Sequence, residues 1–231
     1  MIKVVLIGQG NVASHLVNSF TSAANIDVLQ VNSRQLENIP DADVTIIAVS
    51  DDAIASVSNN VNSTDSLVVH TSGTVSIEVV SHHRKGVFYP LQSFTKNKPV
   101  DFSKVPFCLE STTEKDLVLL EKLTESIQSK PYRVSTEQRK KLHLAAVFVN
   151  NFTNHMYKIG HDICEANEVP FEILHSLIEE TAKKITEISP AEAQTGPAKR
   201  NDQETIQNHL ENLNLHQQEM YALITKSIQD N

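Results

Sequence analysis

Apolar residues in the first half of the chain fall into short continuous runs separated by stretches with helical spacing. Such runs occupy residues 2–7, 27–31, 44–49 and 67–70, and residues 12–23 between the first two have a helical pattern. Strands that lack polar alternation and are separated by helices are typical of a parallel sheet covered on both faces. The first half therefore predicts an α/β domain.

Three weaker strands are predicted at residues 87–89, 105–109 and 132–134, with an amphipathic helix at 114–127 between the last two. Beyond them, the pattern becomes helical throughout. We therefore predict a doubly wound, mostly parallel Rossmann sheet in residues 1–136, followed by an all-α domain in residues 137–231.

The long helix predicted to open the second domain has an N-terminal signal and few breakers. Ser135 and Thr136 offer capping oxygens, and neither Gly nor Pro follows until Gly160. This leaves room for one helix of about thirty residues, which is long for a globular protein. A second helix is predicted from Pro170, and closing helices are predicted within residues 204–230.

A glycine-rich turn follows the first strand and opens the first helix, which is the setting in which a G-x-G-x-x-A motif indicates a dinucleotide site. Glycines permit the tight turn and the close approach of a pyrophosphate to the backbone, and the amides at the helix start face the phosphates. The residues concerned are Gly8, Gln9, Gly10, Asn11, Val12 and Ala13.

The end of the second predicted strand indicates which dinucleotide is preferred. NAD enzymes carry an acidic residue there that binds the ribose hydroxyls. This chain instead has Asn32, Ser33 and Arg34. A guanidinium pairs well with a 2′-phosphate, which a carboxylate would repel. We therefore predict NADP as the cofactor.

Two further loops lie at the carboxyl edge of the predicted sheet, where ligands of such folds bind. Val49, Ser50 and Asp51 follow the third run, and Asp51 is expected mainly to cap the next helix. His70, Thr71 and Ser72 end the next strand. His70 is a candidate proton donor, with orientation of the loop as the alternative role.

Six segments together resemble a bacterial family assigned to the NADP oxidoreductases, in which a Rossmann-like domain precedes a helical domain of unknown function. They are GQGNVA, VNSR, HTSG, FYPLQSF, LHLAAVFVNNFTNHMY and QTGPAKRND. The layout is more distantly similar to pyrroline-5-carboxylate reductase, ketopantoate reductase, the deazaflavin-dependent NADP reductases and the 6-phosphogluconate dehydrogenase-like group. The resemblance implies a reductase, a dimer formed by helices, and possible kinship with an alternative type of ketopantoate reductase.

The chain departs from related hydroxyacid dehydrogenases, in which a Lys and an Asn one turn apart on the long helix serve the substrate. Ala146 and Val147 lie four residues before Asn150 and Asn151, so the lysine is missing. His143 is therefore the candidate proton donor, and Asn150 or Asn151 is the candidate that orients the substrate carbonyl.

Polar residues of the long helix form a stripe when positions advance by about 100° per residue. His143, Asn150, Asn154, Tyr157 and His161 fall on it. The first two are predicted to face the nicotinamide, with a polar helix–helix or dimer contact as the alternative. Arg200 is a candidate to bind a substrate carboxylate, with a salt-bridged loop as the alternative.

Composition excludes several classes of function. The net charge of -8 offers no basic surplus for nucleic acid. Two cysteines make a disulfide framework implausible, and no His, Asp and Glu spacing indicates a metal. We find no signal peptide and no run of membrane length, and therefore expect a cytoplasmic protein.

These observations predict an NADP-dependent oxidoreductase that transfers a hydride to a small carbonyl or imine substrate, with a 2-oxo acid such as ketopantoate as one example. A homodimer through the helical domain is expected. The alternative is a non-catalytic NADP(H)-binding sensor or scaffold. A deazaflavin co-substrate stays open, as do the substrate and the direction of reaction.

Overall fold

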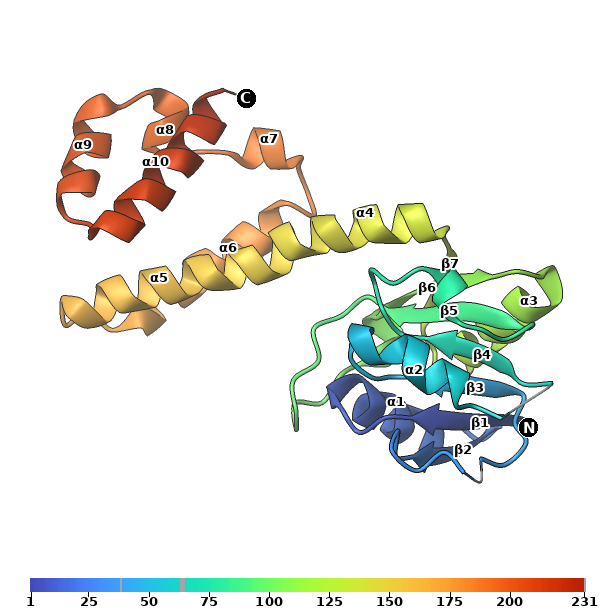
Figure 1. Cartoon of the computed structure of the whole chain (residues 1–231). Coiled ribbons are helices and arrows are strands. Elements are labelled where there is room, and N and C mark those ends of the chain that lie inside the picture. The colour runs from blue at the N-terminus through green and yellow to red at the C-terminus, as the bar shows by residue number, and fades with distance from the viewer. Residues whose placement is uncertain (38, 63–64, 231) are drawn as a thin grey trace. The chain divides into compact units, whose positions relative to one another are not determined.

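A computed structural model describes residues 1–37, 39–62 and 65–230 of the chain. The chain divides into two compact units, Met1–Phe148 and Val149–Asn231 (Figure 1). The sequence placed the boundary between residues 136 and 137. In the structure the boundary lies further along the chain, between Phe148 and Val149. The reason is that the first part of the long helix packs against loops of the sheet and belongs to the first unit.

Seven strands form one sheet in the described part of the first unit, in the order β2-β1-β3-β4-β5-β6-β7. Neighbouring strands are parallel except for the antiparallel pair β5 and β6. This architecture confirms the predicted fold class. The strands are β1 (Ile2–Ile7), β2 (Ile26–Val31), β3 (Val44–Ile47), β4 (Leu67–His70), β5 (Lys85–Pro90), β6 (Pro106–Ser111) and β7 (Lys130–Arg133).

Both faces of the sheet are buried, which explains why its strands are continuously apolar. Val4 and Leu6 of β1 belong to a core shared with α1 and α3, while Val5 and Ile7 belong to a second core shared with α2. The sheet is therefore covered on both sides, as Figure 1 shows. The covering helices are α1 (Asn11–Thr21), α2 (Ile54–Asn59) and α3 (Glu114–Ser126), and 3-10 turns lie at η1 (Asp51–Ala53), η2 (Ile77–Val79) and η3 (Phe102–Lys104).

The long helical run consists of α4 (Thr136–Ala146), a π-helical segment η4 (Val147–Phe152) and α5 (Thr153–Ala166). Ser135 caps its start in a reciprocal pair of hydrogen bonds with Gln138. The stripe predicted along this run assumed uninterrupted α-helical geometry. A π turn closes over one more residue than an α turn, so the regular 100° spacing does not hold from α4 into α5.

The second unit consists of helices that bury few apolar side chains. Among its described residues, Ala198 and Ile206 are the buried apolar side chains. Its further elements are η5 (Phe171–Leu174), α6 (His175–Lys184), α7 (Pro190–Ala193), α8 (Pro197–Arg200), α9 (Gln203–Glu211) and α10 (Leu215–Gln229). In the part of the chain that the structure describes, no helix is both long enough and apolar enough to cross a membrane.

Candidate active site

The turn after β1 has a geometry that only glycine satisfies. Gly8 has a φ of +138°, and a Cβ there would lie 2.1 Å from the carbonyl oxygen of Ala48. Ala13 is completely buried where α1 crosses the sheet, so a larger side chain would push the helix away. Gly8 therefore permits the tight turn beside Ala48, and Ala13 lets α1 pack closely on the sheet, as the motif predicts.

The start of α1 leaves its backbone donors free for a ligand. Gly10 is the N-cap residue and provides no side-chain cap, and the first turn of α1 holds no acidic residue. The first amides of a helix have no partner within the helix and carry the positive end of its dipole. An anion is the natural complement of this end of α1.

A groove of about 800 Å³ opens at the carboxyl edge of the sheet, within the first unit. Its volume lies in the range of small-molecule and cofactor sites. Ten of the predicted cofactor residues line it, at Gly8, Gln9, Gly10, Asn11, Val12, Ser33, Arg34, Val49, Ser50 and Thr71. The groove is completed by Ala48, Ala53, Val57, Gln92 and Phe94.

The turn after β2 presents Arg34 to this groove. Asn32 accepts a hydrogen bond through its Oδ1 from the backbone N of Arg34, at 3.0 Å, so its side chain shapes the turn. Gln30 donates to the carbonyl oxygen of Gly8 at 2.8 Å, which ties this strand to the glycine turn. In the described chain the Arg34 guanidinium makes no ion pair, and it is available to an anion.

The lining of the groove lacks four of the predicted cofactor residues, which are Ala13, Asn32, Asp51 and Ser72. Asp51 and Ser72 instead make hydrogen bonds that stabilise the loop after β4. Asp51 accepts a hydrogen bond from the Thr74 hydroxyl at 2.6 Å. The expectation that Asp51 caps the following helix was wrong, because η1 has no side-chain cap. The Ser72 hydroxyl accepts from the amides of Thr74 and Val75, both at 3.1 Å. These side chains hold the loop in shape.

His70 is completely buried, which favours its alternative role of orienting the loop. Its Nδ1 accepts a hydrogen bond from the backbone N of Ser72 at 3.1 Å. Burial, reinforced by the positive charge of Arg139, lowers the pKa of His70 to about 4. The imidazole is therefore neutral at physiological pH and does not reach solvent, so it is poorly suited to donate a proton.

His143 lies over the same loop on α4 and is half-buried. Its Nδ1 is 3.1 Å from the Tyr89 hydroxyl, and the ring packs against Gly73. In the part of the chain that the structure describes, Nε2 of His143 has no hydrogen-bond partner. Because Thr71 lines the groove and Gly73 follows two residues later, His143 stands beside the part of the loop that lines the groove.

Arg139 fixes α4 on the loop after β4. Its guanidinium is completely buried and donates to the carbonyl oxygens of Ser72 and Val75. It also pairs with Glu110 of β6 at 2.8 Å. These contacts place His143, one helical turn further along α4, against the loop.

Comparison with known proteins defines the family. Residues 105–228, more than half of the chain, match the domain of unknown function named DUF2520. The chain belongs to the DUF2520 family. This confirms the resemblance found in the sequence to a family that joins a Rossmann-like domain to a helical domain of unknown function. A comparison with curated proteins finds no match.

Solved structures extend this result to the whole DUF2520 chain. A Bacteroides fragilis protein named "putative NADP oxidoreductase" is 34% identical, with a TM-score of 0.91, and the match covers 100% of this chain and 98% of the other. Protein TM1727 of Thermotoga maritima is 22% identical, with a TM-score of 0.76 and coverage of 98% and 97%. Pyrroline carboxylate reductase of Plasmodium falciparum, solved with NADP bound, is 13% identical, with a TM-score of 0.59 and coverage of 99% and 98%. The last two show the fold alone.

The candidate residues of the second unit of this DUF2520 chain are exposed. Asn150 and Asn151 lie in the π-helical segment, and their predicted contacts with the substrate stay predictions. Arg200 lies 3.8 Å from Asp202, which fits the alternative reading of a salt-bridged loop. Asn201 adopts a left-handed φ of 54°, as its residue type allows.

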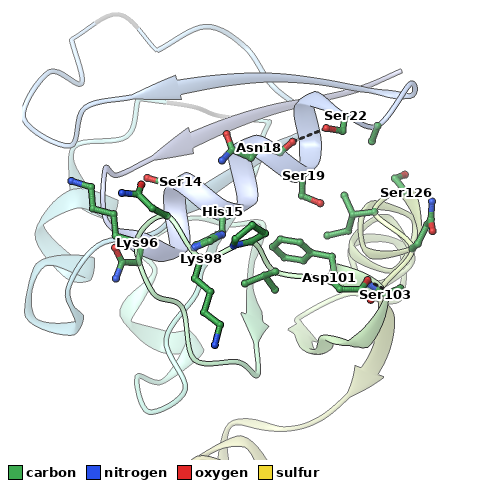
Figure 2. A pocket seen from close by; sticks show the side chains of 18 residues that line it. Ser14, His15, Asn18, Ser19, Ser22, Lys96, Lys98, Asp101, Ser103 and Ser126 are labelled. Atoms are coloured by element: carbon green, nitrogen blue, oxygen red, sulfur yellow. Dashed lines mark hydrogen bonds between the residues drawn. The ribbon is translucent and has the colours of Figure 1, made fainter.

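A second concavity, of about 630 Å³, lies between α1, the loop at residues 96–103 and the end of α3 (Figure 2). Figure 2 shows Ser14 and Asn18 on α1 and Ser22 directly after its end, with Lys96 and Lys98 on the facing loop. Asn11 lines both this pocket and the groove. Apart from Asn11, the pocket contains none of the predicted cofactor or catalytic residues.

Side chains that could ligate a metal come together once in the described chain, at His161, Asp162 and Glu165 of α5. The sequence predicted no metal. Asp162 is already ion-paired with Lys158 on the same helix, and His161 and Glu165 are exposed. Such a cluster is common on helix surfaces without an ion, so it adds no chemistry to the groove.

Sequence reasoning missed three residues that shape the candidate site of this DUF2520 protein. Arg139 and Glu110 form its buried ion pair, and Phe94 lines the groove. Phe94 is tied to the site through its carbonyl oxygen, which accepts a hydrogen bond from Asn11 Nδ2 at 3.0 Å. Phe94 ends the FYPLQSF segment, although the sequence assigned it no role. No local pattern marks Arg139 or Glu110, because their partners are distant in sequence.

Proposed function

We propose that this protein is an NADP(H)-dependent oxidoreductase that transfers a hydride to a small carbonyl or imine substrate. The observation that carries the proposal is the groove at the carboxyl edge of the sheet, in which Gly8, the uncapped start of α1 and Arg34 come together. The name of the similar Bacteroides fragilis protein agrees with it.

The groove residues suit the parts of the dinucleotide in order. Amides at the start of α1 would bind the pyrophosphate, and Ser33 and Arg34 would bind the 2′-phosphate of the adenosine. The nicotinamide would then lie toward Thr71 on the β4 loop. Bound NADPH would supply the hydride, so the protein has to orient the substrate and provide a proton.

His143 is the residue of the first unit best suited to provide that proton. It is half-buried, and its Nε2 has no partner among the described residues. Histidine is also the side chain that most often transfers the proton in general acid catalysis. His70, by comparison, is completely buried, and its hydrogen bond with the backbone N of Ser72 stabilises the loop after β4.

Replacing Arg34 by alanine is expected to weaken NADPH binding by about 10- to 100-fold, because a charged hydrogen bond contributes about 1.5–3 kcal/mol. NADH lacks the 2′-phosphate, so its affinity should change by less than about twofold. Isothermal titration calorimetry measures both. The control is Lys122→Ala, which removes an exposed cation from α3. An equal loss for both nucleotides would contradict the assignment of Arg34.

A substrate panel separates an enzyme from a non-catalytic NADP(H) sensor or scaffold. The panel holds 2-oxo acids, including ketopantoate, together with cyclic imines, and oxidation of NADPH is followed at its absorbance band. Turnover of at least one compound is expected. Tight NADPH binding without any turnover, also in the presence of a deazaflavin, would favour the sensor.

We also propose that the second unit forms a homodimer. Ala198 and Ile206 are the buried apolar residues of its described part, so the unit has a small buried core of its own. Large apolar side chains instead remain exposed on its helices, at Ile173, Leu177, Leu215 and Leu223. A second copy of the chain is an occupant that would cover these side chains.

The unmodified protein is expected to be dimeric, and the double variant Leu177→Glu/Leu223→Glu is expected to be monomeric. Charges buried in an interface without partners are costly, so the association should weaken by at least about a hundredfold. Size-exclusion chromatography with light scattering measures the mass. Glu179→Ala, an exposed change on the same helix α6, is the control. A monomeric unmodified protein at micromolar concentration would contradict the proposal.

A further inference from the structure

We propose that Tyr89 positions His143 for catalysis: its hydroxyl holds Nδ1 of the imidazole, so that Nε2 is the nitrogen that meets the substrate. This inference rests on the proposed function for the identity of the reaction, but the geometry of the pair can be tested without any substrate. It assigns a role to Tyr89, which is a residue outside the groove lining.

The geometry of the pair is built from three different segments. Tyr89 lies on β5, His143 on α4 and Gly73 on the loop after β4. The Tyr89 hydroxyl is 3.1 Å from Nδ1 of His143, and the rings meet edge to face with centroids 6.1 Å apart. The tyrosine thus restrains both the position and the rotation of the imidazole.

Gly73 provides the space for this pair. A Cβ on Gly73 would lie 2.5 Å from Nδ1 of His143 and 2.9 Å from Cζ of Tyr89. Both distances are too short for real contacts, so any side chain at Gly73 would push the imidazole off the phenol. This glycine has an ordinary backbone φ, so what it provides is space and not a special backbone conformation.

The hydrogen bond also selects the tautomer of the neutral ring. Burial raises the pKa of Tyr89 to about 12, so the phenol keeps its proton at physiological pH. In the described chain the Tyr89 hydroxyl has His143 as its hydrogen-bond partner. If the phenol donates its proton in a hydrogen bond to Nδ1, then Nδ1 is the acceptor and the N–H of the neutral ring is on Nε2.

The same contact persists when the ring is protonated, because a hydroxyl both donates and accepts. In the imidazolium, Nδ1–H donates to the phenol oxygen and Nε2–H faces the substrate. If bound NADPH supplied a hydride to the carbonyl carbon, the π electrons of the carbonyl would move onto the oxygen, and that oxygen would take the Nε2 proton. The products would be an alcohol and a neutral imidazole that at first carries its N–H on Nδ1, donated to the phenol oxygen, until Nε2 regains a proton from solvent.

The experiment measures the ¹⁵N shifts of the His143 ring by NMR at a pH where the ring is neutral, using His143→Gln to assign the signals. In the unmodified protein we expect Nδ1 to be the unprotonated nitrogen. In Tyr89→Phe the two shifts should move toward each other as both tautomers become populated. Gly73→Ala retains the hydroxyl and should give the same change. Tyr132→Phe, which removes an exposed hydroxyl from β7, should leave the shifts as they are.

Kinetics supply a second readout. Tyr89→Phe is expected to lower kcat about tenfold while KM and the affinity for NADPH stay within about twofold. Identical His143 shifts in Tyr89→Phe and the unmodified protein would overturn the positioning role. A protein that binds NADPH, shows the expected shifts and turns over no substrate would instead overturn the proposed function and leave the geometry of the pair standing.

Discussion

Replacing Arg139 by alanine is expected to lower the free energy of unfolding by about 3–5 kcal/mol, the usual cost of removing one partner from a buried ion pair. The guanidinium is completely buried, and three groups depend on it: the carbonyl oxygens of Ser72 and Val75 and the carboxylate of Glu110. All three would lose their charged donor at once. Urea unfolding followed by circular dichroism measures the loss.

The matched control is Lys140→Ala, which removes the neighbouring cation on the same helix. Lys140 makes an ion pair with Glu137 at 3.1 Å, but both side chains are largely exposed. Exposed pairs of this kind contribute about 0–1 kcal/mol. If Arg139→Ala cost no more than Lys140→Ala, Arg139 could not be the residue that fixes α4 on the sheet. A double-mutant cycle with Glu110→Gln isolates the energy of the pair.

The second large effect concerns catalysis. His143→Gln is expected to lower kcat by about 10²- to 10⁴-fold, the usual contribution of a positioned general acid. The affinity for NADPH should change little, because His143 does not line the groove. Steady-state kinetics with a substrate from the panel and calorimetry with NADPH measure the two quantities.

His83→Gln serves as the control, since His83 is an exposed histidine outside the groove. It should retain full activity. Unchanged kcat in His143→Gln would assign the proton to another group, and it would also remove the reason to assign a positioning role to Tyr89. A parallel loss of NADPH affinity would indicate that His143 shapes the groove instead.

The residues of the dinucleotide groove could be predicted from the sequence because the patterns that indicate them are local. Gly8, Gly10 and Ala13 act within one strand-to-helix turn, and Arg34 follows the next strand directly. The tolerance of Asn201 for a left-handed backbone is likewise a property of one residue type, and the structure shows it.

Other parts of the site could not be predicted, because they depend on contacts between distant segments. Arg139 reaches Ser72 across 67 residues, and Tyr89 reaches His143 across 54 residues. The sequence also suggested that His70 could donate a proton, because His70 ends its strand at the carboxyl edge of the sheet. The apolar run 67–70 predicted a covered strand, but it did not show that the last residue of the strand is buried as well. The π-helical segment leaves no mark in the hydrophobic pattern of the long helix.

The uncapped N-terminus of α1 connects binding of the proposed nucleotide to the stability of the fold. No side chain caps the start of this helix, and a bound diphosphate would take the place of such a cap. At a concentration a hundred times the dissociation constant, any ligand specific for the native state adds about 2.7 kcal/mol of stability. Cellular supply of NADPH would then govern how long this protein survives unfolding and proteolysis, as well as how fast it works.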